Sequence, residues 1–340
     1  MFAELWRWVI EKLAAFGRWL KGLFSKILTY ISIWVGSLSG STWRRVAVGI
    51  PTVFILYIII GMAFVNRIDD SMDGITPPPA GASAAVETIA YIVERESKSH
   101  NWTPNDPFFM PGYYLDNTPS YQRGIIAAIS RFSFELRDQV GRSRGSSAVD
   151  PDLESAAGNL SKEPGRWTFD FSTSMFPITK SDTYYKEAVD DLRRYNARLA
   201  TGDAIFERRN DNLLATLDRI ALDLGASSSA LDSYIRANSG GFLPDTGADN
   251  EFYQVKGQVY AYALILRALR QDFKSVLDGR ELGSLYDSLL ASVESAASVA
   301  PMVVANGSTN GVLANHLSVQ GFYLLRARTQ LREVTNVLLK

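Results

Sequence analysis

Glu96 is the first residue whose surroundings suggest chemistry, because it precedes Ser97 at the end of a predicted helix. Glycan-cleaving enzymes of the lytic type can work with one glutamate as general acid, held in an apolar pocket that raises its pKa. The second sequence element of such enzymes, a GLMQ-like stretch, is missing here. A solvated carboxylate at a helix end is the competing interpretation, so Glu96 is a catalytic candidate only under an alternative, lytic hypothesis.

Two loops combine aromatic side chains with carboxylates and amides. Such loops can bind glycans or protein partners, because aromatic faces supply contact area and Asp or Asn supplies orientation. Loop packing and helix capping by Asp and Asn are the competing interpretation. The binding candidates are Asp106, Phe108, Phe109, Tyr113 and Asp116 in the first loop, and Asp245, Asp249 and Tyr253 in the second.

Several kinds of chemistry are excluded by composition. The chain has no cysteine, which rules out disulfides, zinc–thiolate sites and cysteine nucleophiles. Its two histidines, His100 and His316, cannot build a histidine-rich metal site. Phosphate-binding glycine motifs and HExxH are absent. Asp245, Asp249 and Glu251 lack the spacing of a calcium loop. We therefore expect no metal and no cofactor.

The elements that position these residues begin with an uncharged run of 20 residues, Val46 to Val65. As a helix it would extend about 30 Å, the thickness of the hydrocarbon core of a bilayer. A cleaved signal peptide fits badly, because the run is long, starts late and lacks a clear small-x-small cleavage site. The sequence therefore predicts a single, retained transmembrane helix over 46–65.

Charge is divided across this run. Residues 1–45 carry seven Lys or Arg and two Asp or Glu, which leaves 28 basic and 34 acidic residues after position 45. Such a split favours two environments and no nucleic-acid partner. Because basic flanks stay in the cytoplasm, we expect a cytoplasmic N-terminus and a C-terminal domain across the membrane. In a Gram-negative bacterium this domain is periplasmic and the span lies in the inner membrane.

The N-terminal segment, 1–45, is predicted to form a basic, Trp-rich amphipathic helix. It would lie on the cytoplasmic leaflet, where Trp prefers the interface and Lys or Arg faces anionic lipid. Docking onto a partner or a second copy, or a membrane hairpin that includes residues 27–43, are the alternatives. The expected interface residues are Trp6, Trp8, Trp19, Trp34, Trp43, Arg44 and Arg45.

The remainder of the chain reads as a linker and a helical domain. Residues 66–83 include Pro77, Pro78 and Pro79, which favour an extended linker. Residues 84–340 repeat apolar side chains at helical spacing, with no strand pattern sufficient for a sheet. The fold class is therefore mainly α: one transmembrane helix followed by an extramembrane, antiparallel helical bundle.

The most specific sequence blocks in this domain are WTPNDP, from Trp102, and LDNTPSYQRG, from Leu115. With the surrounding sequence they resemble the DUF2333 family of uncharacterised bacterial membrane proteins, over the part from the span to the C-terminus. The resemblance implies a bacterial inner membrane and supplies no reaction and no catalytic residue.

Two hypotheses of function follow. The first is a non-enzymatic cell-envelope scaffold or adaptor, which partners the lipid bilayer and either an envelope protein or its own copies. The second is an enzyme that acts on peptidoglycan with Glu96 as general acid. The sequence does not identify the pathway, the partner or the oligomeric state.

Overall fold

A computed structural model of the chain describes residues 42–140, 149–170, 174–238, 247–301 and 315–340, and single positions among 25–36 and at 304 and 306. Four expected interface residues, Trp6, Trp8, Trp19 and Trp34, lie outside these ranges, as does Asp245. For Trp43 and Arg44 only the backbone is described. The chain divides into two compact units, residues 1–60 and 61–340, and each is treated by itself.

Helix α2, Thr42–Val65, contains the uncharged run. From Arg45 to Val65 it is long and apolar enough to cross a membrane, and only 6% of its most apolar stretch is buried within the protein. Ile50, Val53 and Phe64 each expose about two thirds of their surface. A helix of this kind is not the core of a soluble domain, and it is compatible with single-pass membrane anchoring.

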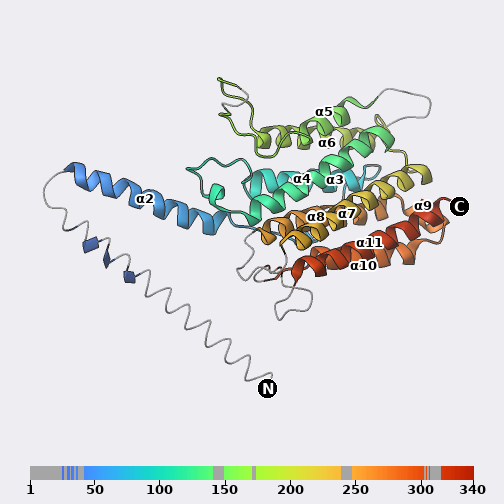
Figure 1. Cartoon of the computed structure of the whole chain (residues 1–340). Coiled ribbons are helices and arrows are strands. Elements are labelled where there is room, and N and C mark those ends of the chain that lie inside the picture. Colours follow the sequence, from blue (N-terminus) through green and yellow to red (C-terminus); the bar gives the residue numbers. More distant parts are fainter. Residues whose placement is uncertain are drawn as a thin grey trace, which may run out of the picture. The chain divides into compact units, whose positions relative to one another are not determined.

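Residues 61–340 form a helical domain (Figure 1). Among the described residues there is no strand, only an isolated bridge between Asn306 and Asn315. The mainly α fold is therefore confirmed. The helices are α3 (Ala84–Glu94), α4 (Asn117–Glu135), α5 (Pro151–Leu160), α6 (Ser181–Thr201), α7 (Asn210–Asn238), α8 (Ala248–Asp272), α9 (Lys274–Gly279), α10 (Gly283–Ala297) and α11 (His316–Leu338).

Helix α8 is the centre of this domain. It packs against α3, α4 and α10, and also touches α7 and α11, while α5 and α6 form a pair on the far side of α3 and α4 (Figure 1). Its twelve consecutive residues Val255–Leu266 are all buried. The sequence predicts one apolar stripe here, but the run Tyr260–Leu266 is apolar on every side, which suits a helix enclosed by others.

Neighbouring helices mostly run antiparallel, but α4 and α8 run parallel. Ser120 meets Asn250, and one turn later Gly124 meets Gln254. The two backbones touch because glycine stands at the crossing: a Cβ on Gly124 would overlap the carbonyl oxygen of Gln254, and one on Gly257 that of Tyr121. The parallel pair brings the N-terminal ends of α4 and α8, and the loops before them, side by side.

The helices begin at residues whose amides are capped by carboxylates, some of them neighbours in sequence and one of them far away. Asp150 and Pro151 begin α5, with the Asp150 carboxylate accepting from the Asp152 amide. Helix α4 begins at Asn117, with Asp116 as its N-cap. The amides of Ala84 and Ala85, which open α3, donate to the buried carboxylate of Asp272 at 2.9 Å each. No local pattern reveals this last cap.

The segment 66–83 is extended but bonded to the domain, and we refer to it as the strap. Thr118 Oγ1 donates to Asn66 Oδ1 at 2.8 Å, directly after the apolar run ends. Ile68, Met72 and Ile75 pack against the hydrophobic core. A linker predicted from its three prolines would be free; this one is fixed because its polar backbone groups satisfy buried side chains of the domain.

We predict that the glycine crossing is essential to stability. Gly124→Ala should lower the melting temperature of the detergent-solubilised chain by about 6 °C, because overpacking costs about 2 kcal/mol. Gly158→Ala, in helix α5 where an added Cβ meets nothing within 4 Å, is the control and should not lower it. Equal melting temperatures for Gly124→Ala and the unchanged chain would contradict the close α4–α8 contact.

Candidate functional site

Glu96 lies in one wide turn, Arg95–Ser99, that continues helix α3 with π-type hydrogen bonding. Its side chain has 0% exposure, and that of Arg95 has 6%. Two adjacent residues point about 100° apart in an α-helix, so only one of them normally faces the core. Here both do, which places an ion pair inside the domain. The interpretation of Glu96 as a solvated helix-end carboxylate is therefore wrong.

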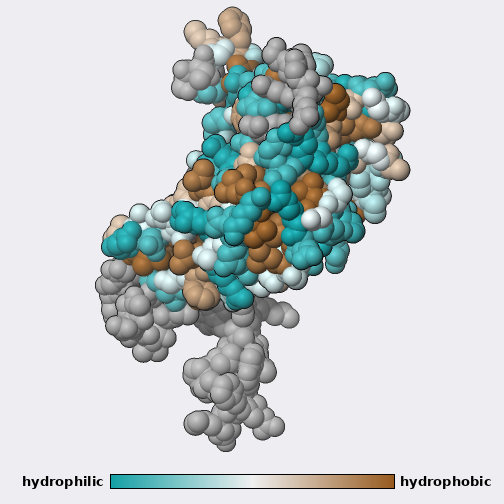
Figure 2. Space-filling view, turned by 90° about the vertical axis from the view of Figure 1, so that its right-hand side faces the viewer, coloured by the Kyte–Doolittle hydropathy of each residue, from teal (hydrophilic) through white to brown (hydrophobic). Residues whose placement is uncertain are grey.

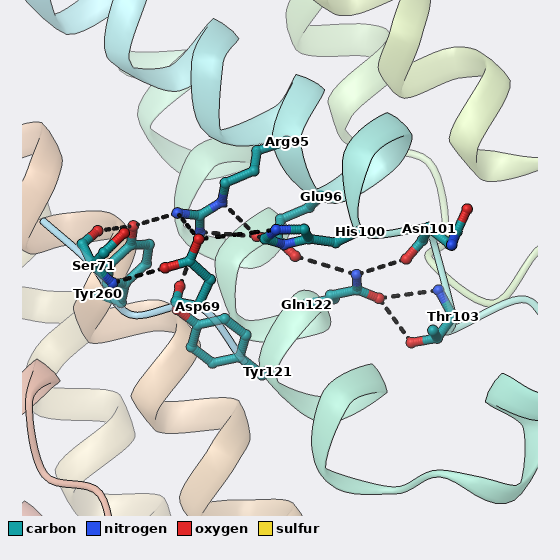
Figure 3. A network of polar contacts seen from close by, with 10 residues as sticks. All are labelled: Asp69, Ser71, Arg95, Glu96, His100, Asn101, Thr103, Tyr121, Gln122 and Tyr260. Carbon is teal, nitrogen blue, oxygen red and sulfur yellow. Dashed lines mark hydrogen bonds and ion pairs between the residues drawn. The ribbon is translucent and has the colours of Figure 1, made fainter. Parts of the chain in front are cut away.

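Arg95 is the centre of a polar network that joins α3, α8 and the strap (Figure 3). Its guanidinium pairs with Glu96 at 2.8 Å and donates to the Tyr260 hydroxyl, also at 2.8 Å. It donates to the Asp69 carbonyl oxygen at 3.1 Å. Tyr260 in turn donates to the Ser71 carbonyl oxygen at 2.7 Å. The strap backbone therefore completes the hydrogen bonding of a buried cation.

The second carboxylate oxygen of Glu96, Oε2, accepts a hydrogen bond from helix α4. Gln122 Nε2 donates to it at 3.2 Å, and the Gln122 carbonyl oxygen accepts from the Thr103 amide and hydroxyl at 3.0 and 2.8 Å (Figure 3). His100 Nδ1 lies 3.3 Å from the first oxygen. Both carboxylate oxygens thus have partners inside the protein, and Glu96 does not line the cavity described below.

Charge keeps the Asp69 carboxyl of this network ionised. Burial alone would raise the pKa of the Asp69 carboxyl, but hydrogen bonds from Ser71 and the charge of Arg95 lower it below its usual value. Burial raises the pKa of the Tyr260 hydroxyl to about 12, so it stays a neutral donor. A general acid needs a carboxyl that is protonated and open to substrate. Glu96, enclosed against a guanidinium, offers no access to a substrate.

Lys256 of helix α8, one turn before Tyr260, is a second buried cation. The Lys256 side chain is 1% exposed, and its ammonium group pairs with Asp70 of the strap at 2.7 Å. It also donates to the Val299 carbonyl oxygen at 2.8 Å, after helix α10. A buried ammonium without an anion is strongly unfavourable. Two neighbouring strap residues, Asp69 and Asp70, therefore each face a cation of the domain.

The first predicted loop surrounds a cavity of about 500 Å³. It lies between this loop, the starts of α4 and α8, and residues 165–167, and Asp106, Tyr113, Asp116, Arg123 and Asn250 are among its lining. Asn250 belongs to the second predicted loop region, so the structure brings the two predicted loops together at this cavity. They meet because α4 and α8, which follow the two loops, run parallel. The cavity mixes both charges with aromatic and amide groups.

Asp106 is the one carboxyl of this cavity with a clearly altered acidity. Burial raises its pKa to about 6, although a hydrogen bond from the Gly112 backbone and the nearby Lys180 lower it. Gly112 fits there because a Cβ at that position would overlap the Asp106 carboxylate. Asp106 is therefore held by the loop and is partly protonated in a mildly acidic compartment.

The other predicted binding residues take different places. Phe108 and Phe109 do not line the cavity but stand outside it, 64% and 39% exposed. Asp249 and Tyr253 lie in the first turns of α8, where burial raises the pKa of the Tyr253 hydroxyl. Among the described residues, no group of three acidic or histidine side chains is placed to hold a metal ion.

Sequence reasoning missed the residues that hold the strap. Lys256 lies between Gln254 and Gln258, ahead of the apolar run of α8, so the sequence around it does not reveal that its charge is buried. In the sequence, Asp69 and Asp70 are only two acidic residues that follow the apolar run. Tyr121 and Gln122 belong to the LDNTPSYQRG block, but no local pattern assigns them a partner, because they bond to residues far away in the sequence. The same holds for Arg95 and Tyr260.

These features define an all-helical domain, held together by buried ion pairs, that follows one helix compatible with single-pass membrane anchoring. The chain belongs to a bacterial family, DUF2333, described as an uncharacterized protein conserved in bacteria, whose profile matches residues 66–239 and 244–340. The resemblance seen in the sequence is thereby confirmed. No curated protein and no solved structure matches the chain.

We predict that Asp70→Asn destabilises the domain by about 3 kcal/mol, because the buried Lys256 ammonium loses its anion. Lys256→Met combined with Asp70→Asn should recover most of this loss, since no unpaired buried charge then remains at this position. Thermal unfolding in detergent of the unchanged chain, the two single variants and the double variant gives the coupling directly. If the double variant is no more stable than Asp70→Asn alone, the ion pair does not fix the strap.

We predict a pH-dependent effect of Asp106→Asn. Because the folded pKa is raised to about 6, the folded chain binds a proton between about pH 4 and 6 that the unfolded chain does not. Stability from this group therefore rises as pH falls through 6, and the buried charge destabilises the fold above it. Asp106→Asn, which keeps an acceptor for Gly112, should raise the melting temperature most at pH 8, less at pH 5 and hardly at all near pH 4. A gain that is independent of pH would contradict this assignment.

Proposed function

We propose that the chain is a non-enzymatic scaffold or adaptor of the bacterial cell envelope, single-pass in the inner membrane, with a cytoplasmic N-terminus and a periplasmic helical domain. The orientation rests on the positive-inside rule: Arg44 and Arg45 precede the apolar run, and Asp69, Asp70 and Asp73 follow it. The lipid bilayer and an envelope protein, or a second copy, are the partners.

The observation that carries the proposal is the strap. A free, extended segment of 18 residues would reach about 55 Å from the membrane, at about 3.1 Å per residue. Here the chain is bonded to the domain from Asn66 onward, and Asp69 and Asp70 bind two buried cations. A segment that bonds to the domain directly after the apolar run, instead of remaining free, suits a protein that positions others at the membrane.

A partner surface is available on helix α11. Val319, Phe322 and Leu325 expose 44%, 63% and 55% of their surfaces, at the spacing of one helix face. The opposite face of α11 packs against α7 and α10. On the face of the domain that Figure 2 shows, apolar residues stand in small groups among hydrophilic ones, which is typical of polar, separable interfaces.

Catalysis by Glu96 receives no support. Its carboxylate is fully buried, both oxygens have partners, and Arg95 would lose its nearest anion if it moved. A substrate of the size of peptidoglycan cannot reach a group with no exposed surface.

A photo-crosslinking amino acid at Phe322 tests the proposal in native membranes. We expect a covalent adduct with an envelope protein or with a second copy, because this side chain projects from an otherwise packed helix. Lys274, which is 70% exposed at the end of the domain, is the matched control position and should give little adduct.

Two results would contradict the scaffold. One is the absence of any adduct at Phe322 and at neighbouring positions of α11. The other is release of soluble fragments from cell-wall polymer by the purified full chain, with loss of that release in Glu96→Gln at a temperature where both chains are folded.

A further inference from the structure

Exposed apolar side chains are concentrated in two loops of the domain. Of the fourteen large hydrophobic residues that are exposed after residue 66 in the described ranges, eight lie in these loops. Five form the aromatic loop, which contains Phe108, Phe109, Met110, Tyr113 and Tyr114, and three lie in the α5–α6 loop, Phe169, Met175 and Phe176. Leaving so much aromatic surface in water at one place is unfavourable, so it marks an interaction site.

The two loops form one surface. Phe109 packs on Trp167 with ring centres 5.7 Å apart, and Trp167 packs on Phe169 at 5.4 Å. Both loops project from the same side of the domain, to the left in Figure 1. Trp167 therefore joins the two loops.

The aromatic loop lies beside the place where the chain leaves the span. Pro111 packs against Gly61, where a side chain would leave no room for the proline ring. Gly61 is four residues before Val65, about 6 Å along the helix axis. Thr118, at the start of α4, is bonded to Asn66 at 2.8 Å. The loop is therefore level with the last turn of the apolar run, within the depth at which amphipathic groups enter a bilayer surface.

The residue types of the two loops suit a position at the surface of a bilayer. Tyr and Trp prefer the boundary between hydrocarbon and water, where the ring is apolar and the hydroxyl or N–H remains wet. Arg123 and Arg166 stand beside the two loops, and neither forms an ion pair with the described residues, so each is open to an anion. Phosphate groups of lipids supply that anion at the same depth.

We propose that the aromatic loop and the α5–α6 loop insert into the interface of the lipid bilayer, on the side of the membrane that carries the helical domain. The span then fixes the chain laterally, and the loops fix the tilt and rotation of the domain. This inference rests on the proposed membrane anchoring, but it does not depend on the scaffold role.

Single cysteine variants of the full chain test it, because the natural chain has no cysteine and labelling is therefore specific. Phe108→Cys, Tyr113→Cys and Phe176→Cys would carry a nitroxide spin label in liposomes of phosphatidylethanolamine and phosphatidylglycerol. Ile205→Cys and Leu222→Cys, at exposed apolar positions before α7 and on α7, are matched controls. Power saturation with oxygen and with a water-soluble nickel complex measures the depth of each label.

We expect labels at 108, 113 and 176 to be several-fold more accessible to oxygen relative to nickel than the two control labels. Equal ratios at all five positions would overturn the inference. Labels that are aqueous in liposomes but immobilised in native membranes would also overturn it, in favour of a protein partner. An Ile55→Cys label separates the proposals: if it lies in hydrocarbon while the loop labels are in water, anchoring stands and only this inference fails.

Discussion

Two buried cations set the conditions for the rest of this structure. Arg95 and Lys256 are almost fully enclosed, and a charge in the protein interior must be paired and hydrogen-bonded. Some of their partners belong to the strap and not to the helices. Arg95 donates to the Asp69 carbonyl oxygen, and its partner Tyr260 donates to the Ser71 carbonyl oxygen. Lys256 pairs with the Asp70 carboxylate. Without the strap, which follows α2, the domain would therefore lack partners for its buried cations. This is why residues with the composition of a linker behave as a structural part of the core.

The second determinant is the parallel crossing of α4 and α8. Parallel neighbours need a long connection, here the whole of α5, α6 and α7, and in return both helix starts lie at the same end of the domain. The loops that precede them consequently share one region, which contains the cavity around Asp106 and the aromatic loop outside it. That region adjoins Asn66, so the polar cavity, the exposed rings and the end of the apolar run are brought together by topology.

Much of the fold could be predicted from local patterns. The apolar run of α2, the five long helices after residue 180 and the Asp150–Pro151 start of α5 follow from periodicity and capping chemistry. The site could not be predicted, because its contacts join distant residues. From the sequence, Glu96 is interpreted as a surface carboxylate, but in the structure it is enclosed by Gln122 and Arg95. Lys256 likewise looks like an exposed polar residue of α8, but it is buried and paired with Asp70. Asp272 caps a helix that begins 188 residues earlier, and no window of sequence contains both.

The long-range cap of α3 also sets an order of events during biosynthesis. Arg95 and its hydroxyl partner on Tyr260 are 165 residues apart, and the first amide of α3 and its capping carboxylate are separated by 188. At about 5–20 residues per second, the ribosome needs roughly 10 to 40 seconds to supply the missing partner. During that interval the earlier half of the domain carries uncompensated charge and open apolar faces, so it cannot fold one helix at a time. We expect it to stay unfolded until α8 has been synthesised, and then to fold in one late, cooperative step.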